Sequence, residues 1–324
     1  MTRTPTAFVT GCATGFGRRL TDRLLAAGWV VHATDPSPPE DWEGGAPSGT
    51  GTLVTHLLDV RDPDQVTQAT QGLGPVDLLV NNAGYAVFGT QEETDLDAVK
   101  ELFDVNVLGL ARVTQAVLPR VREAQGTVVQ LSSVAGRTVF PESGFYAATK
   151  YAVEAMSEAL FQECATFGVR VRLIEPGSFD TRFLDTALER SPAPPENSAY
   201  DGVRELWMRR KVAVLETPQD PERVVDAIMG CLDAPEPFLR IPVGPDSERI
   251  LLVRDLLGAD GWSTFAAERN GLPPQLAPEQ EVAMPSEHAR ERLRALDRWG
   301  HLDHWEDTDV GRAALAVLRA GDTD

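Results

Sequence analysis

Residues 6–17 read Thr-Ala-Phe-Val-Thr-Gly-Cys-Ala-Thr-Gly-Phe-Gly, a short apolar run that ends in a glycine-rich turn. The run predicts a buried strand from Thr6 to Thr10. Apolar residues then recur at helical spacing, which predicts a helix from Gly17 to Ala27. Glycines at such a junction permit positive φ and let backbone amides approach a phosphate at the helix N-terminus. The stretch therefore indicates the first unit of a nucleotide-binding α/β fold.

The same alternation of strands and helices continues along the chain. Short apolar runs predict further strands at Trp29–Thr34, Leu53–Leu58, Val76–Val80, Thr127–Leu131, Val169–Glu175 and Phe238–Val243. Helical spacing predicts helices at Asp62–Leu73, Leu96–Arg122 (with Pro119 as a candidate break), Phe145–Phe167 and Pro221–Leu232. Because alternating βα units place helices on both faces of a parallel sheet, we expect an α/β fold, Rossmann-like and doubly wound, of about seven strands.

Three segments interrupt this alternation. Pro36–Gly51 is rich in Pro and Gly and is expected to be a loop. Ser178–Lys211 has little periodicity and is expected to be a mobile excursion, so that residues 178–215 form a substrate-binding lid. Beyond Gly244 helices are expected at Ile250–Leu257, His288–Trp299 and Val310–Leu318. The predicted organisation is one domain over residues 1–245 and a helical C-terminal extension, residues 246–324, packed on it.

Composition limits the classes of partner. The chain has 324 residues, of which 42% are hydrophobic and 24% charged, so it can bury a large core. Its net charge of −19 and isoelectric point near 4.7 argue against nucleic acid and anionic membranes as partners. The Met1–Thr6 segment lacks the features of a secretion signal, and no apolar run approaches the roughly 20 residues of a spanning helix. A cytoplasmic location is expected.

Neither a disulfide framework nor a metal site is expected. Cys12, Cys164 and Cys231 are widely separated and form no Cys-x-x-Cys pair, and Cys12 is interpreted as a small packing residue. The tail contains two histidines and two aspartates in an unspecific, polar arrangement: His301, His304, Asp297 and Asp303. The predicted metal content is none. Trp262, Trp299 and Trp305 are interpreted as core or docking residues of the tail.

A second motif indicates proton transfer. Tyr146 and Lys150 are four residues apart in Tyr-Ala-Ala-Thr-Lys, thirteen residues after Ser133. On a helix, residues i and i+4 share one face, so a phenol and an ammonium would reach the same pocket. The Ser133 hydroxyl can enter that pocket from a preceding loop. Such groups are suited to moving a proton on and off an oxygen atom.

Asp35 bears on the choice of nucleotide. It ends the second predicted strand, eighteen residues after Gly17, where a carboxylate can accept hydrogen bonds from the ribose 2′-OH of NAD and repel a 2′-phosphate. The neighbouring Thr14 and Pro36 are not basic. The residues therefore favour NAD over NADP, although Arg18 and Arg19 keep the question open.

Taken together, these residues resemble the short-chain dehydrogenase/reductase family. Thr10–Gly17 is similar to its Thr-Gly-x-x-x-Gly-x-Gly turn, and Asn81-Asn82-Ala83-Gly84 to its Asn-Asn-Ala-Gly motif. The resemblance implies a catalytic tetrad of Asn106, Ser133, Tyr146 and Lys150. It also implies cofactor contacts from Gly11, Thr14, Gly15, Phe16, Gly17, Asp35, Asp59, Val60, Asn82, Ala83, Gly84, Tyr146, Lys150, Pro176, Gly177, Phe179 and Thr181. The motifs occur in the family's order from Ala7 to about Gly244.

The resemblance further implies roles for these residues. Thr181 would contact the nicotinamide carboxamide, Asp59 and Val60 would flank the adenine, and Asn106 would help to hold a water chain. The chain looks closest to the branch acting on hydroxysteroids, retinoids and similar lipophilic alcohols. The implied activity is NAD(P)-dependent interconversion of a secondary alcohol and a ketone. A homodimer or homotetramer is implied, with the helices at 96–122 and 145–167 paired across a two-fold axis.

The expected mechanism requires a more acidic phenol. Acting as a base near pH 7 requires the Tyr146 pKa to fall by roughly 3 units from about 10, which corresponds to about 4 kcal/mol. A cation about 5 Å away contributes about 3 kcal/mol at an effective dielectric constant near 20, so Lys150 is expected to be nearly sufficient. The positive nicotinamide ring would provide the remainder, while Ser133 would stabilise charge on the substrate oxygen.

The substrate pocket is expected at the carboxyl ends of the strands. Its candidate walls are mostly apolar: Val134, Val139, Phe140, Phe145, Phe179, Phe183 and Leu184. They favour a hydrophobic alcohol or ketone, with Arg137 and Arg182 as the candidates for binding a carboxylate. Two alternatives stay open, an isomerase, epimerase or lyase that retains NAD and a catalytically silent nucleotide sensor. Retention of both Tyr146 and Lys150 argues against the sensor.

Overall fold

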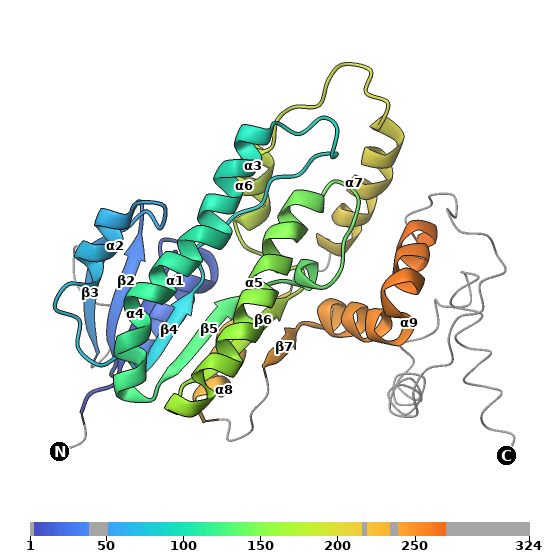
Figure 1. Ribbon diagram of the computed structural model, residues 1–324. Helices are drawn as coiled ribbons and strands as arrows, with labels where there is room; N and C mark the ends of the chain where they lie inside the picture. The colour runs from blue at the N-terminus through green and yellow to red at the C-terminus, as the bar shows by residue number, and fades with distance from the viewer. Residues whose placement is uncertain (1–2, 39–50, 216–218, 234–238, 270–324) are drawn as a thin grey trace, which may run out of the picture.

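The computed structural model describes residues 3–38, 51–215, 219–233 and 239–269. Its centre is a parallel sheet in the order β3-β2-β1-β4-β5-β6-β7 (Figure 1). The strands are β1 (Thr6–Thr10), β2 (Val30–Asp35), β3 (Thr52–Leu57), β4 (Leu78–Asn81), β5 (Thr127–Leu131), β6 (Arg170–Pro176) and β7 (Arg240–Val243). All six pairings are parallel, which confirms the predicted doubly wound sheet.

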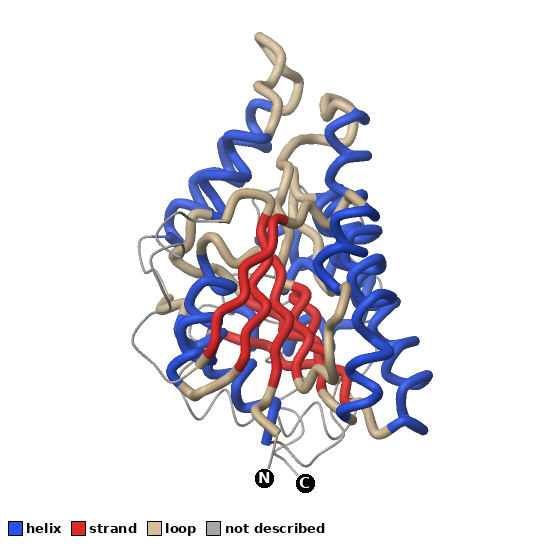
Figure 2. The backbone as a smooth tube through the Cα atoms, turned by 90° about the vertical axis from the view of Figure 1, so that its left-hand side faces the viewer, coloured by secondary structure: helices blue, strands red, loops and turns tan. Residues whose placement is uncertain are grey.

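Helices cover both faces of the sheet (Figures 1 and 2). The α-helices are α1 (Gly15–Ala26), α2 (Pro63–Thr70), α3 (Leu96–Phe103), α4 (Leu110–Ala124), α5 (Gly144–Cys164), α6 (Phe183–Arg190), α7 (Asp201–Leu215), α8 (Glu222–Asp233) and α9 (Pro245–Arg269). A π-helical segment spans Asp104–Gly109, and 3₁₀ turns lie at Val134–Gly136 and Ala165–Phe167.

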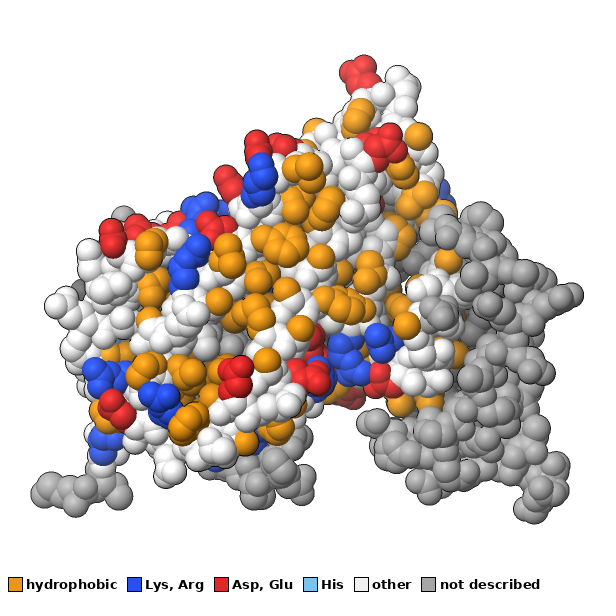
Figure 3. Space-filling model, viewed as in Figure 1, with side chains coloured by type: hydrophobic (Ala, Val, Ile, Leu, Met, Phe, Trp, Pro, Cys, Tyr) orange, Lys and Arg blue, Asp and Glu red, His pale blue; other side chains and the backbone are white. Residues whose placement is uncertain are grey.

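Two separate cores lie on the two faces. On one face α1 and α8 bury residues such as Leu24 and Ile228 against the sheet. On the other face α2, α4 and the end of α5 bury residues such as Val117 and Cys164. Each fully buried leucine or isoleucine contributes about 1.5–3 kcal/mol relative to exposure. Apolar side chains also gather on the outward surface over α4 and α5 (Figure 3).

The strand order reverses between β1 and β4. The chain moves outward from β1 through β2 to β3, returns to β4 beside β1, and then proceeds through β5 and β6 to β7. The loops that follow β1 and β4 therefore leave the sheet in opposite directions and open a crevice at its carboxyl edge. The predicted site residues follow the carboxyl ends of strands or lie on helices that begin there.

The prediction of a long helix at 96–122 with a break at Pro119 is wrong about the position of the break. The interruption is the π-helical segment at Asp104–Gly109, whereas Pro119 lies inside α4. Gly109 explains part of the local geometry, because a Cβ there would come within 2.5 Å of Val60 Cγ2. Such π segments insert one extra residue per turn and are frequent at functional sites. Asn106 lies within this one.

The segment after β6 was expected to have little secondary structure, but it contains the helices α6 and α7. Both helices stand beyond the carboxyl ends of the strands in Figure 1. The helix predicted at Ile250–Leu257 is part of the longer α9, which has a non-helical residue at Gly258. Trp262 packs against Phe140 and Phe265 there. Residues 39–50, Phe238 and the helices predicted at His288–Trp299 and Val310–Leu318 lie outside the described residues.

Candidate active site

The glycine turn after β1 is tied to the segment after β4. The Asn82 side-chain amide donates hydrogen bonds to the carbonyl oxygens of Thr10 and Gly11, each over 2.9 Å. In return, the Thr10 hydroxyl oxygen accepts bonds from the backbone amides of Asn82 and Ala83 at 3.1 and 3.0 Å. These four bonds fix the two sides of the crevice where the strand order reverses.

Two glycines of the turn have no room for a side chain. A Cβ on Gly17 would lie 2.3 Å from the Gly11 carbonyl oxygen, and one on Gly11, whose φ is +70°, would lie 2.9 Å from Ala83 Cα. Gly15, with φ of +59°, has open space instead, because an added Cβ would meet Thr181 Cβ only at 3.9 Å. The three glycines therefore form a cradle that is tightly packed at Gly11 and Gly17 and open beside Gly15.

The start of α1 has the donors that such a group requires. Among the described residues the side chain of Thr14, which precedes the helix, makes no capping hydrogen bond. The first amides of a helix have no intrahelical partner and, with the helix dipole, favour an anion. Phe16 lies in this first turn and packs edge-on against Phe179 at 5.6 Å between ring centres. The unpaired amides make this turn the candidate site for the phosphates of a dinucleotide.

Asp35 lies beside this turn at the end of β2. Its Oδ2 accepts a hydrogen bond from the Ala13 amide and its Oδ1 one from the Ser37 amide, both at 2.9 Å. A carboxylate offers about four acceptor positions, so two remain for ribose hydroxyls. The nearby arginines bind acids of the protein: Arg18 lies 3.3 Å from Asp22 and Arg19 3.2 Å from Glu222.

Asp59 and Val60 follow β3 and are already engaged. Arg61 binds the Asp59 carboxylate at 2.7 Å and thereby lowers the pKa of Asp59. The Asp59 amide donates to the side-chain oxygen of Gln65 at 2.8 Å, and the Val60 carbonyl accepts from Arg112 at 3.3 Å. These contacts fix the loop and engage the Asp59 carboxylate with Arg61.

Asn106 connects the segment after β4 to the helix that carries Tyr146. Its side-chain oxygen accepts from the Tyr85 amide at 3.1 Å, and its amide nitrogen donates to the Tyr85 carbonyl at 2.8 Å and to Thr149 Oγ1 at 3.1 Å. A Cβ on Gly84 would lie 3.0 Å from Asn106 Oδ1 and 3.9 Å from Lys150 Nζ. Gly84 therefore keeps the space between Asn106 and Lys150 open.

Ser133, Tyr146 and Lys150 come together at the start of α5. Tyr146 and Lys150 are both buried, and the Ser133 hydroxyl lies near enough to the Tyr146 phenol to lower its pKa. The Lys150 ammonium nitrogen lies 5.9 Å from the centre of the Tyr146 ring and donates to the Leu131 carbonyl oxygen at 2.7 Å. An ammonium has three donors, so two of them remain for a ligand.

Burial controls the protonation of this pair. It raises the pKa of Tyr146 to about 12, and the nearby Ser133 hydroxyl offsets only part of that rise. Burial also lowers the pKa of Lys150 to about 8 against the favourable charge of Glu154. The expectation that Lys150 is nearly sufficient to make Tyr146 a base is therefore wrong, because it omitted the desolvation of the phenolate. Reaching pH 7 from about 12 corresponds to about 7 kcal/mol.

The segment after β6 closes the crevice from the other side. The Gly177 amide donates to the Val243 carbonyl at 3.0 Å, and the Ser178 amide donates to Asp246 at 2.7 Å. A Cβ on Gly177 would collide with this Asp246 carboxylate. Pro176 ends β6 and is buried. This arrangement brings Thr181 against Gly15 of the phosphate cradle.

Aromatic side chains line the substrate side of Tyr146. The Phe183 ring, which is 38% exposed, lies 5.8 Å from the Tyr146 ring. Phe145 and Leu184 pack on the same cluster as Tyr146, whose buried members include Tyr85, Phe88 and Trp207. Arg137 is not available for a substrate carboxylate, because it pairs with Glu175 at 3.6 Å and with Asp255.

Comparison with known proteins agrees with this geometry. The family described as short chain dehydrogenase matches residues 5–191, which is more than half of the chain. The chain belongs to this family.

Individual relatives support the same conclusion. Retinol dehydrogenase 5 of Mus musculus is 35% identical over 272 residues, which cover 78% of this chain and 84% of that enzyme. Estradiol 17-beta-dehydrogenase 1 of Rattus norvegicus is 36% identical over 246 residues, which cover 72% of this chain and 71% of that enzyme. A solved short-chain dehydrogenase from Streptomyces avermitilis is 33% identical, with a TM-score of 0.66 and coverage of 77% of this chain and 91% of that one.

This short-chain dehydrogenase is therefore an oxidoreductase of the alcohol dehydrogenase/ketoreductase class. The described residues contain no helix with the length and apolar character needed to cross a membrane. Within the same residues no group of three or more potential metal ligands occurs, and the four tail residues considered for a metal lie outside them.

Several residues that organise the site of this dehydrogenase were not found by sequence reasoning. Thr10 and Thr149 each link two catalytic segments through a hydroxyl group. Glu154 was also missed, although its position four residues after Lys150 on the same helix is a signal of proximity. The role of Thr149 depends on a π-helical turn that places Asn106, which a helical pattern alone does not indicate.

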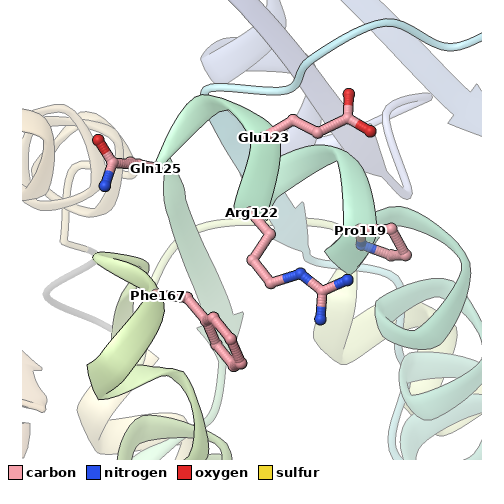
Figure 4. A pocket seen from close by; sticks show the side chains of 5 residues that line it. All are labelled: Pro119, Arg122, Glu123, Gln125 and Phe167. Atoms are coloured by element: carbon pink, nitrogen blue, oxygen red, sulfur yellow. The ribbon is translucent and has the colours of Figure 1, made fainter.

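A surface hollow of about 510 Å³ lies elsewhere on the dehydrogenase (Figure 4). It is lined by residues at the C-terminal ends of α4 and α5: Pro119, Arg122, Glu123, Gln125 and Phe167. Because these helices run antiparallel to the strands, this hollow faces the amino ends of the strands, away from Tyr146. Its cation, Arg122, stacks on Phe167 at 5.1 Å. The hollow is separate from the catalytic residues.

Proposed function

We propose that this dehydrogenase interconverts a secondary alcohol and a ketone on a lipophilic small molecule, with NAD as the preferred cofactor. The observation that carries the proposal is the buried Tyr146 phenol, which lies near Ser133 and the Lys150 ammonium and at the same carboxyl edge of the sheet as the glycine cradle. When bound, the nicotinamide accepts or delivers the hydride at C4.

The protein's own residues would manage the proton and the charge. In oxidation Tyr146 takes the proton from the alcohol oxygen, and in reduction it returns a proton to the developing alkoxide. Ser133 donates a hydrogen bond to the substrate oxygen and stabilises its charge. Lys150 binds the nicotinamide ribose with its two remaining donors, and Asn106 holds the backbone beside a water path. Asp35 accepts from the adenosine ribose, which supports NAD over NADP.

The lid over the substrate is proposed to be the segment 178–215. Its helix α7 is anchored by Arg204, which binds Glu93 at 2.9 Å and Glu142 at 2.8 Å. Near α6, Ser191 accepts a hydrogen bond from the Phe88 amide at 2.8 Å, and Arg190 lies 4.4 Å from the centre of the Tyr85 ring. These anchors hold the segment against the apolar cluster that contains Tyr146 and Trp207, which supports a hydrophobic substrate.

We further propose that two copies of the chain associate through α4 and α5. Apolar side chains gather on this face (Figure 3), and three of the exposed large ones lie on or next to these helices, namely Leu108, Tyr151 and Phe167. An apolar face of this extent is typical of an interface between subunits. Light scattering coupled to size exclusion would give the mass directly, and a monomeric mass at micromolar concentration would contradict the proposal.

The test of the catalytic proposal is a substrate panel. Purified protein is mixed with NADH or NADPH and a series of lipophilic ketones, and with NAD⁺ and the corresponding alcohols, while the absorbance of the reduced nicotinamide is followed. Net consumption of NADH with at least one ketone supports the proposal. An isomerase, epimerase or lyase that retains NAD would instead convert substrate with no net change in nicotinamide, and a silent sensor would bind nucleotide without conversion.

A further inference from the structure

Buried charges lie directly behind the catalytic residues on α5. Tyr146, Lys150, Glu154 and Glu158 follow one another at four-residue steps, so their side chains share one face of the helix. Glu154 is only 5% exposed. A buried carboxylate is costly unless it is paired and hydrogen-bonded, so its surroundings are informative.

The Glu154 carboxylate is held on both oxygens. Its Oε1 accepts a short hydrogen bond from the Ser132 hydroxyl, and its Oε2 accepts one from Arg240 Nε on β7 at 2.8 Å. Ser132 immediately precedes Ser133, and its amide donates to the Ile174 carbonyl at 2.8 Å. Glu154 thus fixes the end of β5 at the point where the chain turns toward the substrate.

The same stretch of β5 is held by Lys150 from the preceding turn of the helix. Lys150 binds the carbonyl oxygen of Leu131, the residue before Ser132. The turn after Ser133 also packs on Glu154, because a Cβ on Gly136 would lie 2.5 Å from Ser132 Oγ and 3.0 Å from Glu154 Cγ. Lys150 and Glu154 therefore form hydrogen bonds with two consecutive residues, Leu131 and Ser132, just before Ser133.

We propose that Glu154 is a positioning residue for the reaction: it holds the turn that carries Ser133, and its negative charge keeps the Lys150 ammonium protonated. The kinetic consequence of this inference rests on the proposed function. Its electrostatic consequence rests on the four-residue spacing of Lys150 and Glu154 on α5 and on the burial of both side chains. Glu154 has no contact with the reacting atoms, since it acts through Ser132 and Lys150.

The other charges around this pair support the assignment. Glu154 raises the pKa of Lys150 against the effect of burial, and Tyr146 is the group on the opposite side of Lys150. Glu175 on β6, fully buried beside Glu154, has its pKa raised to about 7 by burial and by the charge of Glu154.

Two arginines complete the surroundings of the two carboxylates. Arg240 Nε lies 3.8 Å from Glu175, and Arg137, which follows the catalytic turn, lies 3.6 Å from Glu175 on its other side. Arg240 also binds Glu158 at 2.8 Å. The Glu158 side chain is 55% exposed. It lies one helical turn beyond Glu154 and therefore two turns from Lys150. It is therefore a matched control that shares Arg240 with Glu154.

The sequence makes a direct measurement practical, because the whole chain contains three lysines: Lys100, Lys150 and Lys211. Protein labelled with ¹³C in the lysine side chains gives three Cε signals, and Lys150→Arg identifies the signal of Lys150. Following that signal against pH gives the titration midpoint of Lys150 without any substrate. In parallel, kcat for ketone reduction is measured at pH 8.

Glu154→Gln is expected to lower the Lys150 midpoint by about 1 pH unit, because it removes one nearby negative charge. With the midpoint moved from about 8 to about 7, the charged fraction at pH 8 falls roughly fivefold, and kcat falls by at least that factor. Glu158→Gln is expected to leave both the midpoint and kcat unchanged. An unchanged midpoint in Glu154→Gln, or equal shifts in the two variants, would overturn the proposal.

A second variant separates charge from position. Glu154→Asp keeps the charge but withdraws the carboxylate from Ser132, so the Lys150 midpoint stays near the wild-type value while kcat falls. Wild-type kcat in Glu154→Asp overturns the positioning role, and this holds even where Glu154→Gln does not fold. If wild-type protein reduces no ketone, the proposed function fails, whereas the NMR midpoints still decide whether Glu154 controls the charge of Lys150.

Discussion

The ammonium nitrogen of Lys150 lies 5.9 Å from the centre of the Tyr146 ring, while its hydrogen bond goes to the Leu131 carbonyl oxygen. Burial acts on the two groups in opposite directions, since it raises the pKa of Tyr146 to about 12 and lowers that of Lys150 to about 8. Below pH 8 the protein without ligand therefore holds a protonated phenol beside a charged ammonium. This is the protonation state that donates a proton to a ketone.

The first prediction concerns pH. Reduction requires the protonated Tyr146 and the charged Lys150, and the lower of the two pKa values limits the alkaline side. The kcat for ketone reduction is expected to be constant up to about pH 8 and to fall above it, with a slope of about tenfold per unit. A reduction rate that rises between pH 8 and 10 would contradict this assignment. Measuring kcat, not KM, keeps substrate binding out of the comparison.

The second prediction tests the phenol itself. Tyr146→Phe removes the proton donor and keeps the ring, so kcat is expected to fall by several orders of magnitude, within the range of about 10²–10⁴ or more for a lost general acid. NADH binding, followed by nucleotide fluorescence, is expected to survive. Turnover near wild type in Tyr146→Phe would refute the assignment.

The third prediction addresses the choice of nucleotide. The Asp35 carboxylate faces the turn at Ala13, where a 2′-phosphate would meet a negative charge. Wild-type protein is expected to bind NADH more tightly than NADPH, and Asp35→Asn to reduce that difference mainly by improving NADPH binding. Asp64→Asn, an exposed position at the start of α2, is expected to change neither affinity. Tighter binding of NADPH by the wild type would reverse the NAD assignment.

A fourth prediction tests the cradle. Gly17→Ala places a methyl group 2.3 Å from the Gly11 carbonyl oxygen, so the turn must shift. Overpacking of this kind costs about 1–3 kcal/mol, and the displaced amides no longer match a pyrophosphate. Both Tm and NADH affinity are expected to fall. Gly74→Ala is the control, because no described atom lies within 4 Å of a Cβ there, and equal losses in the two variants would argue against the cradle.

The sequence predicted the sheet well because each of its signals is local. The apolar run at 6–10 and the glycines after it each specify their own conformation, and β1 begins and ends where it was expected. The interruption at Asp104–Gly109 was not predicted, since it depends on contacts of Asn106 and Gly109 with distant segments. Helices α6 and α7 were also missed, because the Pro-rich residues between them obscure the periodicity.

In the candidate site, too, features set by local sequence were predictable and features set by distant contacts were not. The segments that follow the strands could be predicted to meet, because parallel strands bring their carboxyl ends to one edge of the sheet. The pKa of Tyr146 could not be predicted from the sequence. It depends on desolvation, and the sequence does not show how completely α5 is covered. Glu154 likewise acquires its role only when β5, β7 and α5 meet.

The last prediction concerns substrate selection at Phe183. Its ring lies 5.8 Å from that of Tyr146 and is 38% exposed, so it is placed to cover an apolar substrate bound over the phenol. In Phe183→Ala the loss of this apolar contact is expected to cost about 1–2 kcal/mol for a fused-ring ketone, which raises its KM roughly tenfold. A small aliphatic ketone does not extend to this ring, and its KM is expected to stay within about twofold of wild type. Comparing the two KM values in the same variant controls for any disturbance of Tyr146, because such damage would lower kcat for both ketones. An equal change in KM for the two ketones would show that Phe183 supports the fold of α6 and does not select the substrate.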